Sequence, residues 1–158
     1  MAVRQLTLSQ GSPRDIAAVD ALMATAFDPR FGEAWTHGQV LGVLAMPGVR
    51  LTLATMDDRP AGFALTRTVL NETELLLLAV DPAHRRRGIG AALLDTTVDE
   101  ARSIGARTMF LEVRAGNDAA SLYTRYGFVK IGERRSYYRA GTGPAHDAHS
   151  YRLIIADR

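Results

Sequence analysis

The 158-residue sequence contains no cysteine. This absence excludes disulfides, thiolate zinc sites and cysteine nucleophiles, and it is compatible with a reducing compartment. The first ten residues, MAVRQLTLSQ, lack the long apolar core of a signal peptide, and no apolar run approaches the length of a membrane span. We therefore expect a soluble, cytoplasmic protein. Residues 1–158 are expected to form a single domain, because this length can bury a sizeable core without disulfides or metal.

A large excess of charge of either sign is also missing, since 19 Lys and Arg residues accompany 17 Asp and Glu residues, for a formal charge of +2. The basic residues gather in two short clusters, Arg85–Arg87 and Arg134–Arg135. A nucleic-acid footprint is usually a broader basic stripe interleaved with aromatic residues. The clusters favour a compact anion site, and we expect no direct nucleic-acid contact and no membrane contact. The four histidines lack ligand spacing, so we also expect no metal.

Apolar patterns with periods of 2 and 3.6 residues divide the chain into strands and helices. Strands are expected at Val3–Leu8, Val49–Met56, Ala61–Val69, Thr73–Val80, Thr108–Val113, Phe128–Glu133 and Ser150–Ile155. Helices are expected from the cap Ser12 to Phe27, from the cap Thr36 to Leu44, from Ile89 to Ile104, and from Asn117 or Asp118 to Gly127. The segment Tyr137–His149 is rich in Gly, Ala and His and is expected to be a loop near the site. An antiparallel meander followed by a βαβ unit indicates an α/β (α+β) fold.

The segment RRRGIG, Arg85 to Gly90, joins a predicted strand to a predicted helix. Backbone amides at a helix start lack intrahelical partners, and the helix dipole favours anions there. Gly88 and Gly90 would let a ligand approach the backbone, while the arginines would neutralise phosphate charge. A dinucleotide fingerprint is excluded because its third glycine position holds Leu93, and the P-loop pattern is absent. The segment predicts a pyrophosphate cradle, and on its own it leaves open a basic helix start without a ligand.

The order of segments around this cradle resembles motifs A and B of the GNAT superfamily of acyl-CoA-dependent N-acyltransferases. The resemblance covers Thr73 to Glu133. Within the superfamily, AVDPAHRRRGIGAALL, LEVRAGNDAASLYTRYGF and RRSYY are most similar to the RimI-like ribosomal-protein-alanine N-acetyltransferases, and EAWTHGQV, Glu33 to Val40, is a weaker match to their substrate-side helix. The resemblance implies the GNAT fold, with a mixed central sheet of six to seven strands, about four helices on both faces, and two strands splayed apart for acyl-CoA.

The resemblance also implies a binding site for acetyl-CoA. The pyrophosphate would be held by Arg85, Arg86, Arg87, Gly88, Ile89, Gly90 and Ala91. The strands Leu75–Val80 and Thr108–Val113 would diverge, so that the pantetheine arm pairs with Ala79 and Val80. The Val80 amide would then be the candidate oxyanion donor. Asn117 matches an asparagine that contacts the pantetheine region, and a role as a helix N-cap is compatible with that contact.

Alternation along the strand places Glu112 on the same face as Phe110, at the edge where the strands would diverge. From this pattern alone, an exposed glutamate paired with Arg114 is the plainer interpretation. The resemblance instead places Glu112 at the position of the general base. Glu74 is the second candidate, because many relatives carry a functional acid at the start of that strand.

Two groups of tyrosines match positions of the same branch. Tyr123 lies where the family has the tyrosine that protonates the leaving CoA thiolate, although helical spacing with Tyr126 would otherwise indicate a core residue. Tyr137 and Tyr138 match a paired aromatic motif that lines the acceptor pocket, and ordinary packing is the open alternative.

The resemblance thus implies transfer of the acetyl group of acetyl-CoA to a primary amine by direct attack in a ternary complex. The implied acceptor is the N-terminal alanine of a small-subunit ribosomal protein. Because a free α-amine has a pKa of about 8, a base must remove a proton before attack. The sequence departs from the branch at Leu77 and in the loop Ala140–Ala148. A small-molecule amine acceptor and a non-catalytic acyl-CoA sensor therefore stay open, as do monomer and homodimer.

Overall fold

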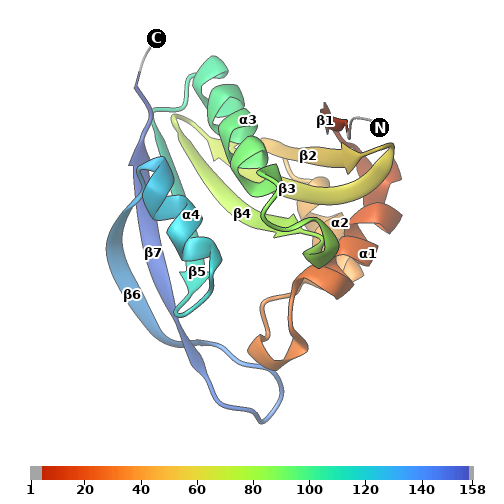
Figure 1. The fold of residues 1–158 in the computed structure, drawn as a ribbon. Helices are drawn as coiled ribbons and strands as arrows, with labels where there is room; N and C mark the ends of the chain where they lie inside the picture. The colour runs from red at the N-terminus through yellow and green to blue at the C-terminus, as the bar shows by residue number, and fades with distance from the viewer. Residues whose placement is uncertain (1–4, 157–158) are drawn as a thin grey trace.

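The computed structural model describes residues 5–156, in which seven strands form one mixed sheet with helices on both faces (Figure 1). The strand order is β1-β2-β3-β4-β5-β7-β6. Neighbouring strands are antiparallel except β4 and β5, which are parallel. The strands are β1 Leu6–Gln10, β2 Val49–Met56, β3 Arg59–Val69, β4 Glu72–Val80, β5 Thr108–Arg114, β6 Val129–Tyr138 and β7 His146–Ile154. The expected α/β fold and mixed sheet are confirmed.

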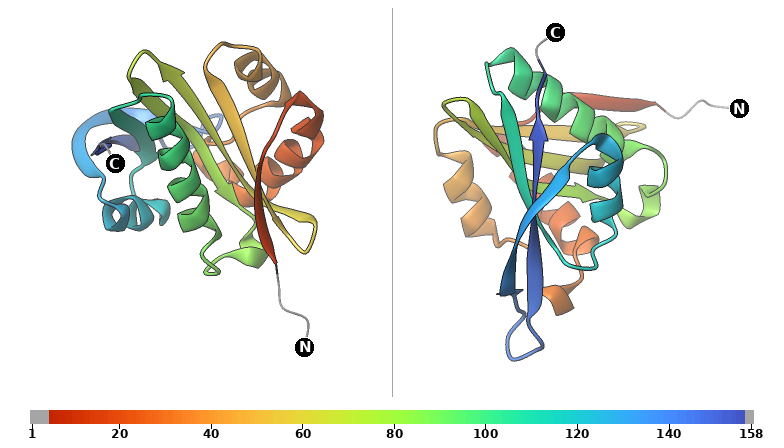
Figure 2. Two further views of the ribbon diagram at one scale, coloured as in Figure 1. Left: turned by 90° about the horizontal axis from the view of Figure 1, so that it is seen from above. Right: turned by 90° about the vertical axis from the view of Figure 1, so that its left-hand side faces the viewer.

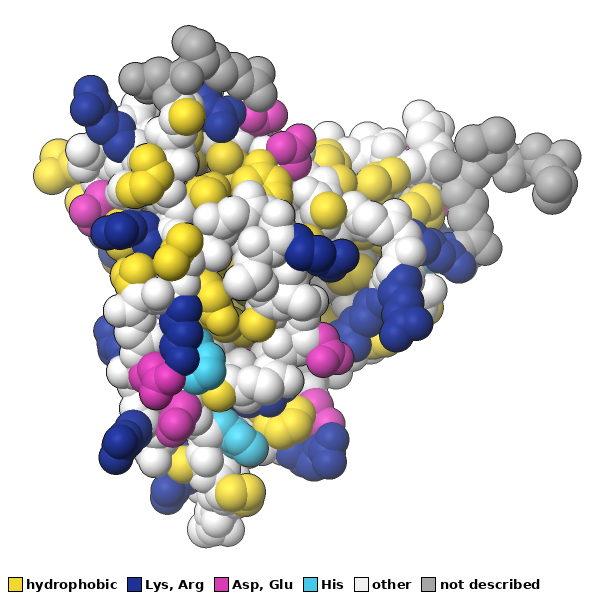
Figure 3. Space-filling model, turned by 60° about the vertical axis from the view of Figure 1, so that its left-hand side comes forward, with side chains coloured by type: hydrophobic (Ala, Val, Ile, Leu, Met, Phe, Trp, Pro, Cys, Tyr) yellow, Lys and Arg dark blue, Asp and Glu magenta, His cyan; other side chains and the backbone are white. Residues whose placement is uncertain are grey.

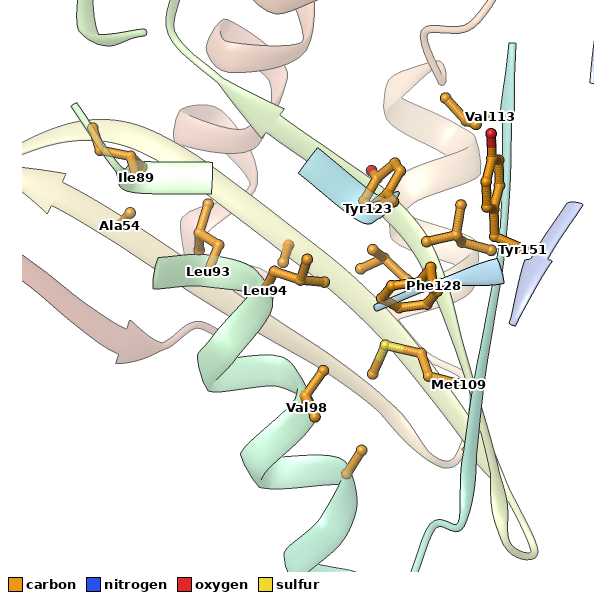
Figure 4. Packing of buried hydrophobic residues seen from close by; sticks show 14 of the residues in the cluster. Ala54, Ile89, Leu93, Leu94, Val98, Met109, Val113, Tyr123, Phe128 and Tyr151 are labelled. Atoms are coloured by element: carbon orange, nitrogen blue, oxygen red, sulfur yellow. The ribbon is translucent and has the colours of Figure 1, made fainter. Parts of the chain in front are cut away.

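Helices cover the two faces of this sheet in pairs, with α1 and α2 on one side and α3 and α4 on the other (Figure 2). The α-helices are α1 Ile16–Ala26, α2 His37–Leu44, α3 Ile89–Ser103 and α4 Ala119–Tyr126, and the 3-10 helices are η1 Pro13–Asp15, η2 Pro29–Phe31 and η3 Pro82–His84. Each face has its own apolar core. One core contains Val19 and Leu22 of α1, both buried. The other contains Leu93 and Leu94 of α3, also buried (Figure 4).

Local capping explains where the first two helices begin. Thr36 and Gln39 form a capping box at the start of α2, as the expected cap at Thr36 requires. Ser12 and Asp15 form another capping box, but the first turn that follows is η1, so α1 itself starts at Ile16. The first strand, β1, covers Leu6–Gln10, whereas Val3–Leu8 was expected. Val3, at the predicted start, lies outside the described residues.

The parallel strands β4 and β5 share only a short pairing. Their register runs from Glu72 opposite Thr108 to Leu75 opposite Leu111 and then stops. On its other side, β4 has a bulge, because consecutive residues of β3 pair with Leu75 and Leu77 and leave Leu76 extra. The bulge turns Leu77 toward the core of α1 and α2, whereas Leu75 faces α3. The expected splay of these strands is therefore present, beginning after Leu75.

The expectation of a loop over Tyr137–His149 is wrong at both ends of that segment. Both β6 and β7 continue through it, and only residues 139–145 connect them. Tyr138 pairs with His146, and the two strands extend beyond the sheet as a ribbon (Figure 1). In a two-stranded antiparallel ribbon the inward-facing backbone groups pair between the strands and the outward-facing groups are exposed to water, so the ribbon forms without the apolar alternation that the sequence reading required. Among the described residues, no helix is both long and apolar enough to cross a membrane.

Candidate functional site

The predicted cradle is an exposed turn between η3 and the start of α3. Arg86 and Gly88 both adopt left-handed backbone conformations, with φ of 64° and 77°. Left-handed residues between ordinary ones are typical of backbone nests that bind anions. The first turn of α3 has no side-chain cap and no acidic residue, and a Cβ built on Gly88 would meet no atom within 4 Å. The turn is therefore open, basic and rich in backbone donors, which fits a pyrophosphate group.

Three residues of the predicted cradle, Arg85, Ile89 and Gly90, also make structural contacts. The guanidinium of Arg85 donates to the carbonyl of Ala26 at 2.9 Å, which ties the cradle to the end of α1. Ile89 is buried in the core, so only its backbone can face a ligand (Figure 4). A Cβ on Gly90 would lie 3.2 Å from Leu122 of α4. The second glycine therefore serves helix packing, a role that spacing alone does not reveal.

A cavity of about 80 Å³ lies where β4 and β5 diverge. The structure brings Glu112, Asn117, Tyr123 and Tyr138 together at its wall. The remaining residues that line it are Phe27, Glu33, Trp35, Leu75, Leu76, Leu77, Leu78, Leu111, Val113 and Ala119. Of the other predicted site residues, Glu74, Tyr137, Ala79 and Val80 are not part of this lining. The cavity thus combines apolar walls with two carboxylates, an amide and two phenols.

Tyr123 is the most deeply buried polar residue at the cavity. Its ring packs edge-on against Phe128 with 5.8 Å between centroids (Figure 4). Burial raises the pKa of the Tyr123 hydroxyl, and Tyr138 and Glu33 raise it further. The phenol therefore stays protonated at physiological pH and can act as a proton donor. Burial also raises the pKa of Tyr138, again with a contribution from Glu33.

Glu112 forms an ion pair with Arg134, with 2.8 Å between Oε1 and Nε, and its side chain is 22% exposed. The interpretation that paired Glu112 with Arg114 is wrong, because Arg114 binds Glu33 instead. Glu112 and Arg114 do lie on one face of β5, as alternation required. The partner of Arg114 is nevertheless Glu33, which comes from the segment between α1 and α2.

Glu74 lies beside Glu112 on the neighbouring strand. In the parallel register of β4 and β5, Glu74 is opposite Phe110, which lies two positions before Glu112. Partial burial raises the pKa of the Glu74 carboxyl, and the negative charge of Glu112 raises it further, while Arg134 and Arg67 oppose the shift. Much of the Glu74 side chain is nevertheless exposed, and it lies outside the cavity lining. The geometry therefore favours Glu112 over Glu74 for chemistry inside the cavity.

Glu33 is the cavity residue to which the sequence reading assigned no role. Its Oε1 accepts from Arg114 Nε and its Oε2 accepts from Asn117 Nδ2, both at 2.9 Å. Asn117 in turn caps α4 by accepting from the Ala119 amide. Because Glu33 lies 81 residues before Arg114, no local periodicity could have paired them. The one available signal was its place at the start of the segment EAWTHGQV.

On the face shown in Figure 3, Lys and Arg side chains are interspersed with acidic and apolar ones and form no broad basic stripe.

Comparison with known proteins places this geometry in a family. The [Ribosomal protein bS18]-alanine N-acetyltransferase of Salmonella typhimurium is 45% identical over 103 residues, which are 65% of this chain and 66% of that enzyme, just under two thirds of its length. The N-alpha-acetyltransferase RimI of Mycobacterium tuberculosis is 34% identical over 88% of this chain and 86% of its own.

A solved structure of a related enzyme has the same fold. The crystal structure of the ribosomal-protein-S18-alanine N-acetyltransferase of Escherichia coli superposes with a TM-score of 0.86 and 32% identity, over 98% of this chain and 96% of that one. The profile of the Acetyltransferase (GNAT) family matches residues 18–128, which span both cores, the cradle and α4. The resemblance inferred from motifs A and B is confirmed, and the chain belongs to the GNAT family of acetyltransferases.

Proposed function

We propose that this protein transfers the acetyl group of acetyl-CoA to the N-terminal α-amine of a ribosomal protein that begins with alanine. The observation that carries the proposal is the cavity beyond the last β4–β5 pair, where the carboxylate of Glu112 and the phenol of Tyr123 share one wall. The bS18-alanine acceptor named for the Salmonella typhimurium relative supports the choice of acceptor.

Acetyl-CoA, the acyl donor of this family, supplies an acetyl group activated as a thioester. Amides from Arg86 to Ala91 would bind its pyrophosphate, and the side chains of Arg86 and Arg87 would neutralise the charge. The unpaired edge of β4 beyond Leu75 offers backbone donors to the rest of the molecule. Val80 is the expected oxyanion donor, and Leu75 to Leu78 line the cavity, so those of their amides that face the gap are alternative donors.

Two protons must leave the ammonium nitrogen during the transfer, and one must reach the departing sulfur. The incoming ammonium loses one proton to Glu112, and its nitrogen then bonds to the acetyl carbon to give a tetrahedral intermediate. As the intermediate collapses and the carbon–sulfur bond breaks, the nitrogen loses its second proton to solvent, which leaves a neutral amide. Tyr123 donates its proton to the sulfur that leaves, and solvent restores the phenol. Positioned acid–base groups of this kind contribute roughly 10²- to 10⁴-fold each to rate. Apolar walls from Leu76, Leu77 and Trp35 would exclude competing water.

The test is release of free CoA thiol with acetyl-CoA and a panel of acceptors. A peptide that begins with alanine and follows a ribosomal-protein N-terminus should support turnover, whereas the same peptide with a blocked amine should not. Turnover with small amines alone would indicate a small-molecule acetyltransferase. Binding of acetyl-CoA without turnover for any acceptor would indicate an acyl-CoA sensor and overturn the proposal.

A further inference from the structure

The reaction cavity contains a second carboxylate, Glu33, in addition to Glu112. Its side chain is only 9% exposed and its partner Arg114 only 12% exposed. Each oxygen of Glu33 accepts one hydrogen bond, from Arg114 and from Asn117. Since a carboxylate offers about four acceptor positions, acceptor capacity is left on Glu33 toward the cavity.

The segment that carries Glu33 is held in place by close packing. A Cβ on Gly32 would lie 2.4 Å from the carbonyl oxygen of Arg139, so only glycine permits this approach of the segment to the β6–β7 connection. The neighbouring Phe31 ring lies 3.7 Å below the Arg114 guanidinium and contacts His146 edge-on at 5.1 Å between centroids. The Glu33 carboxylate is therefore presented by a fixed scaffold, as a binding group requires.

The surroundings of Glu33 define what it can bind. Glu33, Tyr123 and Tyr138 line the same cavity, and the charge of Glu33 contributes to the raised pKa of both phenols. Arg114 is the cation on its outer side, and Glu112 is the other anion at the cavity wall. A cationic group with several N–H donors that enters between these carboxylates would complete the hydrogen bonding of Glu33.

We propose that Glu33 binds the α-ammonium group of the acceptor and holds it for deprotonation by Glu112. The inference rests on the proposed function and assigns to Glu33 a role in acceptor binding in addition to its contacts with Arg114 and Asn117. It predicts that Glu33 discriminates in favour of acceptors with a charged amine over otherwise identical peptides without one.

The experiment compares the unmodified protein with Glu33→Gln and the control Glu72→Gln, which removes an exposed charge at the start of β4. Glutamine keeps the size of Glu33 and an oxygen for Arg114. At pH 7, Glu33→Gln should raise the KM for the alanine peptide about 10-fold, the value of one charge-assisted hydrogen bond. The difference should shrink at pH 9, where the amine, with a pKa of about 8, is mostly neutral. Glu72→Gln should leave both values unchanged.

A desamino peptide, in which a propionyl group replaces alanine, separates charge recognition from structure. As a competitive inhibitor it should bind the unmodified protein and Glu33→Gln equally. An unchanged KM in Glu33→Gln, or an equal loss for the peptide and its desamino analogue at both pH values, would overturn the role of Glu33 and leave the proposed function intact. Absence of peptide-dependent turnover in the unmodified protein would instead remove the proposed function and this inference with it.

Discussion

Arg134 on β6 reaches across β7 to form its ion pair with Glu112 on β5, with 2.8 Å between the charged atoms. Ser150 of the intervening strand lies 3.5 Å from the same carboxylate oxygen. Glu112 is thus held through Oε1 by residues of β6 and β7, and in the proposed reaction Oε2 would accept the substrate proton. A group held in one orientation in this way is what general base catalysis requires.

Replacing Glu112 by glutamine should lower kcat by about 10²-fold or more, because the amide cannot accept the proton of the amine. The KM for acetyl-CoA should stay the same, since Glu112 does not belong to the cradle. Steady-state CoA release gives both constants. Glu74→Gln serves as the matched control, since it removes a neighbouring carboxylate that lies outside the cavity lining. A larger loss of kcat in Glu74→Gln than in Glu112→Gln would assign the base to Glu74.

Tyr123→Phe should also lower kcat by about 10²-fold, because the leaving sulfur loses its proton donor. The aromatic contact with Phe128 is kept, so the thermal midpoint should change little. Tyr126→Phe is the control, because Tyr126 is on the same helix but bonds to Asp95 outside the cavity. Equal turnover in the Tyr123→Phe and Tyr126→Phe proteins would rule out the acid role.

Gly88→Trp should raise the Kd for acetyl-CoA at least 10-fold, because a large side chain would cover the amides of the cradle. Gly105→Trp is matched to it, since both glycines have left-handed backbone angles and open space around the missing Cβ. Both variants carry the same kind of backbone strain, so they should lose similar stability. Isothermal titration should find weaker binding in Gly88→Trp only, and similar affinities in the two variants would place the pyrophosphate elsewhere.

The strand–turn–helix junction at Arg85–Gly90 was predictable because its signals are local, whereas the splay of β4 and β5 was expected only from the resemblance to the GNAT superfamily. The segment Arg85–Gly90 carries its chemistry within six residues, and the apolar periods of β4 and α3 fix their ends. The pairing of Glu33 with Arg114 was not predictable, because it depends on how the segment before α2 folds back over the sheet. The length of β6 was underestimated for a related reason. Its residues are mostly exposed, and backbone pairing with β7 leaves little trace in side-chain pattern.

Gly32→Ala tests the scaffold that carries Glu33. The added Cβ would meet the Arg139 carbonyl at 2.4 Å, and the backbone angle of 66° disfavours alanine. The segment should shift away from the β6–β7 connection, at a stability cost of about 1–3 kcal/mol. Urea unfolding would give this cost, and the KM for the acceptor should rise while the affinity for acetyl-CoA holds. Gly38→Ala, where a Cβ meets no atom within 4 Å, should show neither effect.

Alkaline pH should destabilise the fold through its tyrosines, and Tyr126 offers a direct check. Burial and the hydrogen bond to Asp95 raise its pKa to about 12 in the folded state, against about 10 when unfolded. Below pH 10 both states keep the proton, so stability does not change with pH through this group. Between about pH 10 and 12 the unfolded chain loses the proton first, and the free energy of unfolding falls.

Tyr126→Phe removes this dependence while the other tyrosines stay the same in both proteins. The loss in unfolding free energy between pH 9 and pH 11 should therefore be smaller in the variant, by less than about 1 kcal/mol because the side chain is partly solvent-screened. Urea unfolding of both proteins at the two pH values measures the difference. Tyr126→Phe also loses the hydrogen bond to Asp95, which lowers the free energy of unfolding at pH 9. This loss does not affect the test, because the change between pH 9 and pH 11 is measured separately within each protein. An identical alkaline loss in the two proteins would mean that the Tyr126 hydroxyl titrates alike in the folded and unfolded chains.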